Sequence, residues 1–189
     1  MTDPDGATFA EVFMRDIAPK IGNFFNNWGM VENCLILALS AVLKIDQLRA
    51  KIVFAEIASF YPKINLMRRI LKTHYIDNKS RKDILELLKD TQDMGGTRDR
   101  YAHASWGFGE VNGIKKVFIM PGTAPKPTDE TFEIPRAIEP AEIQADVSKA
   151  DGLTKRWREF FQNSIATLEE DPRVRKAREF LEQTARSAQ

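Results

Sequence analysis

Cysteine and histidine are scarce in this chain of 189 residues, which contains one cysteine and two histidines. A single cysteine excludes an internal disulfide framework, and the three residues together provide no recognised zinc spacing. Cys34 lies in an apolar run. We therefore expect it to be a small buried hydrophobic residue in a protein of a reducing compartment.

Sequence motifs for common cofactors are also missing. No glycine-rich phosphate loop follows a strand pattern, no acidic loop has calcium-ligand spacing, and no serine lies in a nucleophile elbow. These absences argue against the dehydrogenase, kinase and serine hydrolase classes. We predict neither a metal nor a cofactor.

Neither sign of charge dominates the chain. Lys and Arg number 28 against 27 Asp and Glu, which gives a net charge of +1, so any contact with nucleic acid must be local. The N-terminal sequence MTDPDGATF lacks the apolar segment of a secretory signal, and the most hydrophobic run, residues 31–45, is too short for a bilayer core of about 30 Å. We expect a cytoplasmic protein that does not enter a membrane.

Helical periodicity dominates the first hundred residues. Thr8 and Glu11 have the spacing of a capping box, and Pro19 is expected to interrupt the short helix that follows and to open the next one. That next helix is the longest, because its apolar residues keep three-and-four spacing throughout. Its apolar positions are Ile21, Phe24, Phe25, Trp28, Val31, Leu35, Ala38, Leu39 and Val42.

Shorter helices are predicted between the longest helix and residue 97. Asp46 is expected to cap the first of them, and Pro62 to open the second. Their apolar faces are expected to contain Leu48, Ile52, Ala55 and Ala58 in the first, Ile64, Met67, Ile70 and Leu71 in the second, and Ile84, Leu85, Leu87 and Leu88 in the third. Gly95 and Gly96 are expected to break or kink the third, with Thr97 as a new N-cap.

The pattern changes to strand-like alternation after residue 106. Asn112 and Gly113 form the strongest short hairpin signal in the chain, since a two-residue turn there pairs apolar residues and opposite charges. The expected pairs are Val111 with Ile114, Glu110 with Lys115, and Phe108 with Val117. A third strand is expected over residues 131–134, and a final helix over about residues 140–170.

These patterns predict a mainly α fold in one domain, residues 1–171. The expected architecture is an antiparallel helical bundle of about four to six helices, with a small β-hairpin at about residues 106–120 inserted before the C-terminal helix. A chain of 189 residues with 43% hydrophobic residues is large enough to bury one core. Residues 172–189 are charged with little apolar repeat, so we expect a mobile tail there.

The segment TRDRYAHASW, residues 97–106, gathers residues suited to acid-base chemistry. On a helix Asp99 precedes His103 by four residues, so its carboxylate can reach a ring nitrogen, fix the tautomer and favour the protonated ring. Arg98 and Arg100 add fixed positive charge. Metal-free cleavage of a phosphodiester needs at least two kinds of group, an imidazole that transfers protons and a guanidinium that binds the phosphate.

The same segment resembles the motif of the HEPN superfamily, all-helical proteins that include metal-independent endoribonucleases. In that motif four to six residues separate an arginine from a histidine, and Asn, Asp or His commonly follows the arginine. Arg98, Asp99 and His103 fill these positions. The resemblance extends over the first 106 residues, where Trp28 and Glu32 lie one turn apart on the longest predicted helix.

The resemblance implies a function and roles for its residues. His103 would activate the ribose 2′-hydroxyl or protonate the leaving 5′-oxygen, Arg98 would stabilise charge on the phosphate, and Asp99 would orient the site. The products would carry 2′,3′-cyclic phosphate and 5′-hydroxyl ends. Members of this family often act as bacterial toxins or defence effectors, so an antitoxin or regulatory protein is a candidate partner.

Helix geometry bears on the number of chains that form the site. An ideal helix places residues five apart about 140° around its axis, so Arg98 and His103 do not share one face. A cleft on a two-fold axis would bring His103 of one chain near Arg98 of the other, and HEPN proteins typically dimerise in this way. We therefore predict a homodimer that binds and cleaves RNA.

Other residues have weaker claims to a role. Arg100 and Tyr101 are candidate supporting residues because they lie within the motif. Glu32 lies in the most apolar helix and needs a partner there, so it either supports the site or pairs with a buried arginine for structure alone. The basic residues of the helix after Pro62 are a hypothetical RNA-facing patch: Arg68, Arg69 and Lys72.

The alternative interpretation belongs to another functional class, a non-catalytic helical dimerisation or binding module. In such a module the arginine and histidine only hold their helix in place. Burial distinguishes the two interpretations. Sealing of Arg98 and His103 in the core favours the module, and their exposure on an open cleft shared by two chains favours the nuclease.

Overall fold

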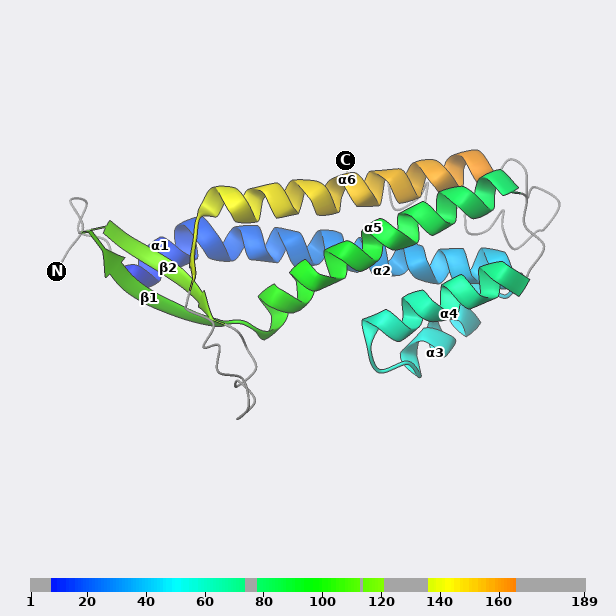
Figure 1. The fold of residues 1–189 in the computed structure, drawn as a ribbon, viewed down its shortest axis with the longest axis horizontal. Coiled ribbons are helices and arrows are strands. Elements are labelled where there is room, and N and C mark those ends of the chain that lie inside the picture. The colour runs from blue at the N-terminus through cyan, green and yellow to red at the C-terminus, as the bar shows by residue number, and fades with distance from the viewer. Residues whose placement is uncertain (1–7, 74–77, 113, 121–135, 166–189) are drawn as a thin grey trace. The chain divides into compact units, whose positions relative to one another are not determined.

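The structure is a computed structural model that describes residues 8–73, 78–112, 114–120 and 136–165. The fold is mainly α, with a small antiparallel sheet inserted before the C-terminal helix (Figure 1), which confirms the predicted fold class. In chain order the elements are α1 (Phe9–Val12), the π-helical segment η1 (Phe13–Ile17), α2 (Ala18–Leu43), α3 (Gln47–Ala55), α4 (Phe60–Thr73), α5 (Asn78–His103), β1 (Ser105–Val111), β2 (Ile114–Met120), β3 (Arg136–Ile138) and α6 (Pro140–Ile165).

The predicted capping box at the start of α1 is confirmed. The backbone N–H of Glu11 donates to the Thr8 hydroxyl oxygen at 3.2 Å, and the Thr8 N–H donates to the Glu11 carboxylate at 2.6 Å. Pro19 lies in the first turn of α2, as predicted, and has no N–H to donate. The chain before it forms the π-helical segment η1, in which the Ala18 N–H donates to the Phe13 carbonyl. Pro19 therefore changes the helical bonding without interrupting the helix.

The predicted apolar face of α3 is wrong, although its cap is right. The Arg49 N–H donates to the Asp46 carboxylate at 2.9 Å. Leu48 and Ile52 are 68% and 54% exposed, however, and Phe54 is the large side chain that is buried. Because this short helix is apolar on more than one side, its spacing does not select a face, and burial of the aromatic ring removes the larger area from water.

The sequence predicts a break or a kink at Gly95 and Gly96, and of these two the break is wrong. Helix α5 runs unbroken from Asn78 to His103, so Thr97 lies inside it and is not a new N-cap. A Cβ atom on Gly95 would lie 2.8 Å from Cε1 of Phe60. Glycine at this position therefore allows the ring to pack against the α5 backbone, and the helix accommodates the glycine at a cost of about 1 kcal/mol.

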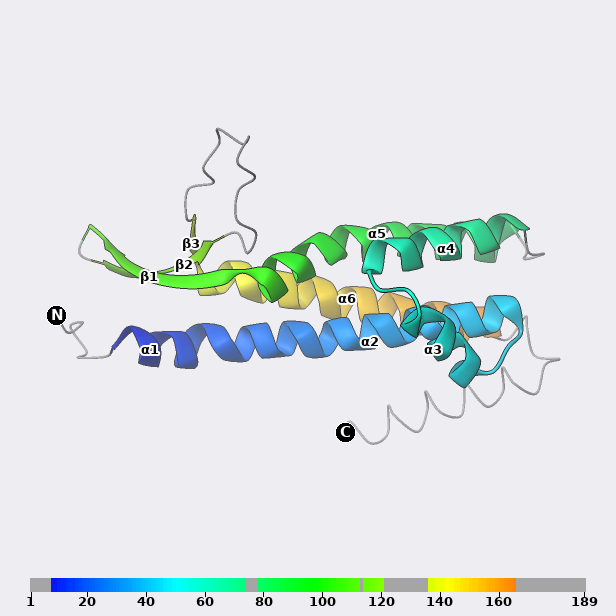
Figure 2. The ribbon, with the colours of Figure 1, turned by 90° about the horizontal axis from the view of Figure 1, so that it is seen from below.

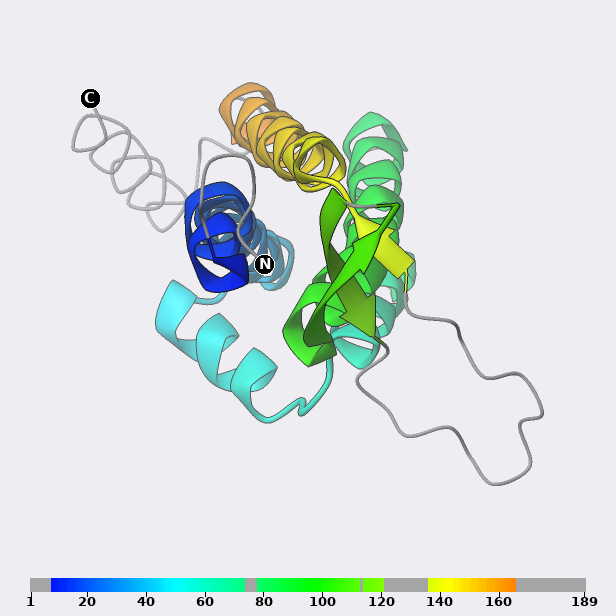
Figure 3. The ribbon, with the colours of Figure 1, turned by 90° about the vertical axis from the view of Figure 1, so that its left-hand side faces the viewer.

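The hairpin forms with the predicted register. β1 and β2 pair antiparallel, with Val111 opposite Ile114, Glu110 opposite Lys115 and Phe108 opposite Val117. Asn112 has φ 53°, the left-handed conformation that such a turn requires and that asparagine tolerates. The third strand is β3, which pairs with β2 and leads directly into α6 (Figure 3). The strand expected over residues 131–134 lies outside the described residues.

The helices and strands belong to two compact units, and α2, α5 and α6 each contribute residues to both. The first unit comprises the described residues within 8–28 and 96–151, and the second those within 29–95 and 152–165. Buried residues of the first unit include Ile17, Phe24, Trp28, Tyr101, Val117, Ile119, Ile138, Ile143, Val147 and Ala150. Those of the second include Val31, Cys34, Leu35, Leu39, Phe54, Ile64, Met67, Leu71, Ile84, Leu88, Thr91, Trp157 and Phe161. The predicted boundary at residue 171 and the tail 172–189 lie outside the described residues.

Trp157 is an anchor of the second unit. It is fully buried, and its indole N–H donates to the Thr91 hydroxyl at 3.0 Å, which joins α6 to α5 within that unit. The Thr91 hydroxyl in turn donates to the Leu87 carbonyl at 2.7 Å. Cys34 is buried, as predicted, and this burial raises the pKa of its thiol to about 12, with the charge of Arg158 acting in the opposite direction.

None of the described helices alone combines the length and the hydropathy that a membrane-spanning helix requires. The segments Phe9–Leu43 and Gln47–Ala55 pass that test only as a pair bent by 116°, on length and composition alone.

Alanine substitutions at helical glycines should have opposite effects on stability. An added Cβ would have no atom within 4 Å at Gly29 in α2 or at Gly152 in α6. Alanine should raise the free energy of unfolding by roughly 0.5–1 kcal/mol at each of these sites. Gly95→Ala should lower it, because the new methyl group forces Phe60 to move. Urea titrations followed by circular dichroism measure the change, and a more stable Gly95→Ala variant would contradict this packing.

Candidate functional site at the end of α5

The predicted motif occupies the last two turns of α5, in the first unit. Helix α5 ends at His103, so Arg98 and His103 are both helical, and the chain continues directly into β1 (Figure 2). His103 is exposed, and the Arg98 side chain is 35% exposed. Neither residue is sealed in the core. The imidazole and a guanidinium group of this chain are therefore both accessible to a large ligand such as RNA.

Asp99 interacts with its neighbour in sequence. Nη1 of Arg98 donates to the Asp99 carboxylate at 2.9 Å, and among the described residues this replaces the expected contact between Asp99 and His103. The charge-assisted bond to an adjacent guanidinium is the stronger interaction available to a 40% exposed carboxylate. Asp99 therefore orients Arg98, and the orienting role predicted for it applies to the arginine.

Arg100 and Tyr101 are held by a carboxylate from another helix. The Tyr101 hydroxyl donates to Oδ2 of Asp146 at 2.7 Å, and Nη2 of Arg100 donates to the same oxygen at 2.9 Å. Lys149 donates to the other carboxylate oxygen at 3.3 Å. The Asp146 side chain is only 11% exposed, so these three partners compensate for the cost of burying its charge.

Sequence reasoning did not identify Asp146, which is 45 residues from Tyr101 in the chain. A signal for it does exist in the sequence. Asp146 lies one turn after Ile143, next to Val147 and one turn before Ala150, on the buried stripe of α6. A carboxylate in such a stripe needs a partner, although helical periodicity cannot say which residue provides it.

Aromatic contacts fix the Tyr101 ring within the first unit. The ring packs edge-on against Phe24 of α2 at 5.1 Å between centroids and stacks with Trp106 of β1 at 6.4 Å. Trp106 in turn contacts Phe13 of η1 at 5.6 Å. The end of α5 is thereby attached to α2, β1 and α6. The accessible residues Arg98 and His103 therefore lie on a backbone that Tyr101 holds in place.

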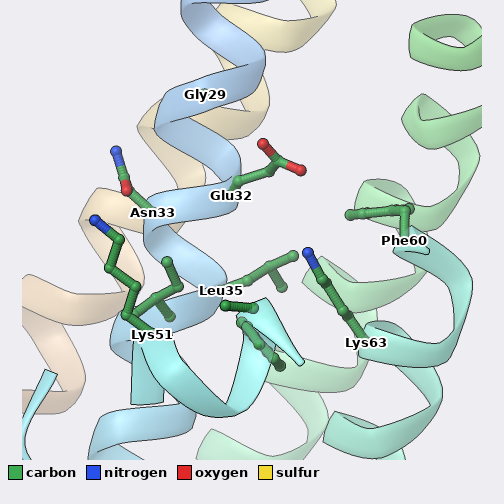
Figure 4. Close-up of a pocket in the computed structure, with 10 residues that line it drawn as sticks. Gly29, Glu32, Asn33, Leu35, Lys51, Phe60 and Lys63 are labelled. Atoms are coloured by element: carbon green, nitrogen blue, oxygen red, sulfur yellow. The ribbon is translucent and has the colours of Figure 1, made fainter. Parts of the chain in front are cut away.

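The remaining candidate residues lie in the second unit. Glu32 is half-buried in α2 and lines a pocket with Lys51 and Lys63 (Figure 4), and no ion pair to Glu32 is found in the described part of the chain. Because Glu32 reaches solvent, its carboxylate does not require the buried arginine that its sequence context suggested. Of the hypothetical RNA-facing residues on α4, Arg69 and Lys72 are exposed and Arg68 is half-buried.

Acidic, histidine and cysteine side chains do not converge on a metal site in the parts of the chain that the structure describes. His74, the second histidine, lies outside those parts. Arg98 and His103 bring an accessible guanidinium, which can bind oxyanions, and an accessible imidazole to the end of α5.

Removing the Tyr101 hydroxyl should change how stability depends on pH. Burial, followed by the hydrogen bond and charge of Asp146, holds the pKa of Tyr101 above its ordinary value of 10.0. The folded state favours the neutral phenol. The stabilisation that the buried, hydrogen-bonded phenol provides is therefore fully present below about pH 10, and it is lost as the pH rises through the raised pKa. Above about pH 10 the wild type should lose stability more steeply than Tyr101→Phe.

Urea unfolding across the alkaline range measures this difference, with Tyr61→Phe as the matched control because Tyr61 is 43% exposed. At neutral pH, Tyr101→Phe should also cost about 1–2 kcal/mol, since Asp146 loses a hydrogen-bond donor. If the free energy of unfolding falls equally steeply above about pH 10 in the wild type and in Tyr101→Phe, the contact between Tyr101 and Asp146 is contradicted.

Comparison with known proteins assigns no relative to this chain, because no family model, curated protein or solved structure matches it.

Proposed function

We propose that the protein is a metal-independent endoribonuclease of the HEPN type that acts as a homodimer. The observation that carries the proposal is the arrangement at the end of α5. Arg98 and His103 are accessible to solvent, whereas Tyr101 between them is 3% exposed and bonded to Asp146. A site of this kind offers a proton-transfer group and an anion-binding group on a helix that is held in place.

In the proposed reaction, His103 removes the proton from a ribose 2′-hydroxyl, and the 2′-oxygen attacks the adjacent phosphorus. The bond between phosphorus and the 5′-oxygen breaks, and a protonated imidazole returns a proton to that oxygen. The RNA is left with a 2′,3′-cyclic phosphate on one fragment and a 5′-hydroxyl on the other. No metal is required, because proton transfer and charge stabilisation are both assigned to side chains.

Arg98 stabilises the negative charge that grows on the phosphoryl oxygens during attack. Its guanidinium is engaged by Asp99 through one nitrogen, which restricts the side chain and leaves its other donors for the phosphate. Arg100 is a weaker candidate for this role, since its Nη2 is bonded to Asp146 and its guanidinium lies 5.1 Å from the Tyr101 ring centroid. Arg100 and Tyr101 are therefore assigned to positioning.

The angular separation of Arg98 and His103 supports a site built by two chains. Both residues lie in one uninterrupted helix, so the angle of about 140° between residues five apart applies to them. We propose that a two-fold axis brings Arg98 of one chain to His103 of the other. In this proposal the basic residues of α4, Arg68, Arg69 and Lys72, are candidates for contacts with RNA phosphates.

A non-catalytic dimerisation or binding module is the second candidate function. The observation that favours it is that two of the six residues from Arg98 to His103 have a structural role, because Arg100 and Tyr101 bind Asp146. Under the nuclease proposal, activity as a toxin or defence effector controlled by an antitoxin or regulatory protein is an extension that follows from the resemblance.

Cleavage of single-stranded RNA by the purified protein in EDTA tests the proposal. His103→Ala should reduce the cleavage rate by about 10²- to 10⁴-fold, because the proton-transfer group is lost. Arg98→Ala should reduce it by about 10²- to 10³-fold, because charge on the phosphate is no longer stabilised. Mass spectrometry of the fragments should find 2′,3′-cyclic phosphate ends.

Two matched variants control for loss of a histidine or of a paired arginine. His74→Ala removes the other histidine, and Arg15→Ala breaks an Arg–Asp pair between sequence neighbours that has the same form as the pair of Arg98 and Asp99. Both should cleave RNA at the wild-type rate. Undiminished cleavage by His103→Ala and Arg98→Ala would refute the mechanism, and absence of cleavage by the wild type would favour the module.

A further inference from the structure

A pocket in the second unit is separate from the residues assigned to RNA cleavage. It has a volume of about 390 Å³ and is lined by residues of α2, α3 and α4. The lining residues are Gly29, Glu32, Asn33, Leu35, Ile36, Lys51, Phe54, Ala55, Phe60 and Lys63. Figure 4 shows the side chains of Glu32, Phe60 and Lys63 converging on one space from α2 and α4. An apolar interior with a few polar groups at its wall is typical of a binding pocket.

The Phe60 wall of this pocket is fixed by packing on its other side. The ring lies so close to Gly95 that an added Cβ there would be 2.8 Å away. Tyr61 also packs edge-on against Phe60, at 6.2 Å between ring centroids. The aromatic wall is therefore held in place before any ligand binds.

An exposed apolar stripe on α3 leads into the same pocket. Leu48, Ile52 and Ala55 follow one another at helical spacing, and Ala55 is a lining residue. Leu48 is 68% exposed and Ile52 is 54% exposed, and the neighbouring Val53 is 37% exposed. Single exposed apolar residues are ordinary, but a contiguous group beside a pocket indicates an interaction surface.

The charge of α3 and α4 determines which partner fits. Residues 47–73 contain six basic residues and one acidic residue, Glu56. Arg49 is paired with Asp46, and Arg68, Arg69 and Lys72 are the candidates for RNA contacts, so Lys51 and Lys63 provide the charge for this surface. Lys51 and Lys63 lie at the pocket, and neither forms an ion pair within the described residues. An apolar surface with this positive charge complements a ligand that is both apolar and acidic.

We propose that α3 and α4 form a docking site for an acidic amphipathic segment of a partner protein. The segment's apolar face covers Leu48 and Ile52, and its carboxylates lie near Lys51 and Lys63. One aromatic anchor residue enters the pocket. The Glu32 carboxylate at the pocket wall repels an acidic anchor and accepts a hydrogen bond from a phenol or indole, so the anchor is a tyrosine or tryptophan.

The pocket also distinguishes this partner from an anionic membrane. A lipid surface matches the positive charge and the apolar stripe, but it provides no aromatic side chain to fill a cavity of about 390 Å³ that has a carboxylate in its wall. An amphipathic peptide provides the negative charge, the apolar face and the aromatic anchor together, as amphipathic helices do when they bind apolar grooves.

Fluorescence anisotropy of the full-length protein with a labelled probe peptide tests this proposal. The probe carries glutamates on one helical face and leucines with one tryptophan on the other. A scrambled peptide and a peptide with lysines in place of the glutamates are the ligand controls. The probe should bind saturably and more weakly at high salt, while both control peptides should bind at least about tenfold more weakly.

The double variants Leu48→Ser/Ile52→Ser and Lys51→Glu/Lys63→Glu should each weaken probe binding by about tenfold or more. Leu85→Ser and Lys89→Glu are the matched controls, because both residues are exposed on α5 of the same unit, and they should bind as the wild type does. Circular dichroism checks that every variant is folded. Equal binding of the probe by all variants, or of the scrambled peptide by the wild type, would overturn the proposal.

Two further measurements assign the surface to a different occupant if the proposal is wrong. Binding to phosphatidylcholine and phosphatidylserine vesicles that is lost in the same double variants, without probe binding, would show a membrane site. Sedimentation in which Leu48→Ser/Ile52→Ser dissociates a wild-type dimer would show that the surface binds a second copy. RNA cleavage depends on Arg98 and His103 of the first unit, so either proposal can fail while the other holds.

Discussion

The buried carboxylate of Asp146 is the interaction on which the candidate site depends. It accepts hydrogen bonds from Tyr101 and Arg100 at the end of α5, and it belongs to α6. A carboxylate that is only 11% exposed is costly unless it is paired, so the contact strongly favours one placement of the α5 terminus within the first unit. The same contact fixes the backbone positions of the accessible residues Arg98 and His103, because they lie on the same helix as Tyr101.

This constraint separates two kinds of residue within one short motif. Tyr101 is buried against the carboxylate and holds the helix, whereas Arg98 and His103 are accessible. Arg100 combines the two properties, because it binds the carboxylate while its side chain is 42% exposed. A stable scaffold and a reactive surface can lie next to each other in sequence because successive helical residues point in different directions. The binding-module interpretation thus concerns the residues that hold the helix, and the nuclease interpretation concerns the accessible ones. The two interpretations differ in whether His103 transfers protons.

The sequence was most informative where structure is set by near neighbours. The caps at Thr8 and Asp46 and the hairpin register around Asn112 depend on residues a few positions apart, and they were predicted correctly. The contact of Tyr101 with Asp146 was not foreseen, because it joins residues 45 positions apart. Helical spacing shows which residues share a face but does not identify what that face meets.

Two predictions from the sequence, one for α5 and one for α3, are wrong for the same physical reason. Propensity alone predicts that Gly95 breaks or kinks a helix, but α5 is not broken there, and tertiary packing against Phe60 accounts for a glycine inside it. The face of α3 was chosen from spacing alone, but burial of Phe54 left Leu48 exposed. In both cases an aromatic side chain from the tertiary structure outweighed a local preference, and the exposed stripe on α3 became a candidate docking surface.

Complementation between two inactive variants tests most directly whether Arg98 and His103 form one site across two chains. His103→Ala and Arg98→Ala are mixed under conditions that exchange subunits, and RNA cleavage is measured before and after exchange. Random exchange makes half of the dimers mixed, with one intact site in each, so activity should rise from nearly zero to about one quarter of the wild-type value. A mixture that exchanges subunits, as mass spectrometry would show, and yet stays inactive would contradict the shared site.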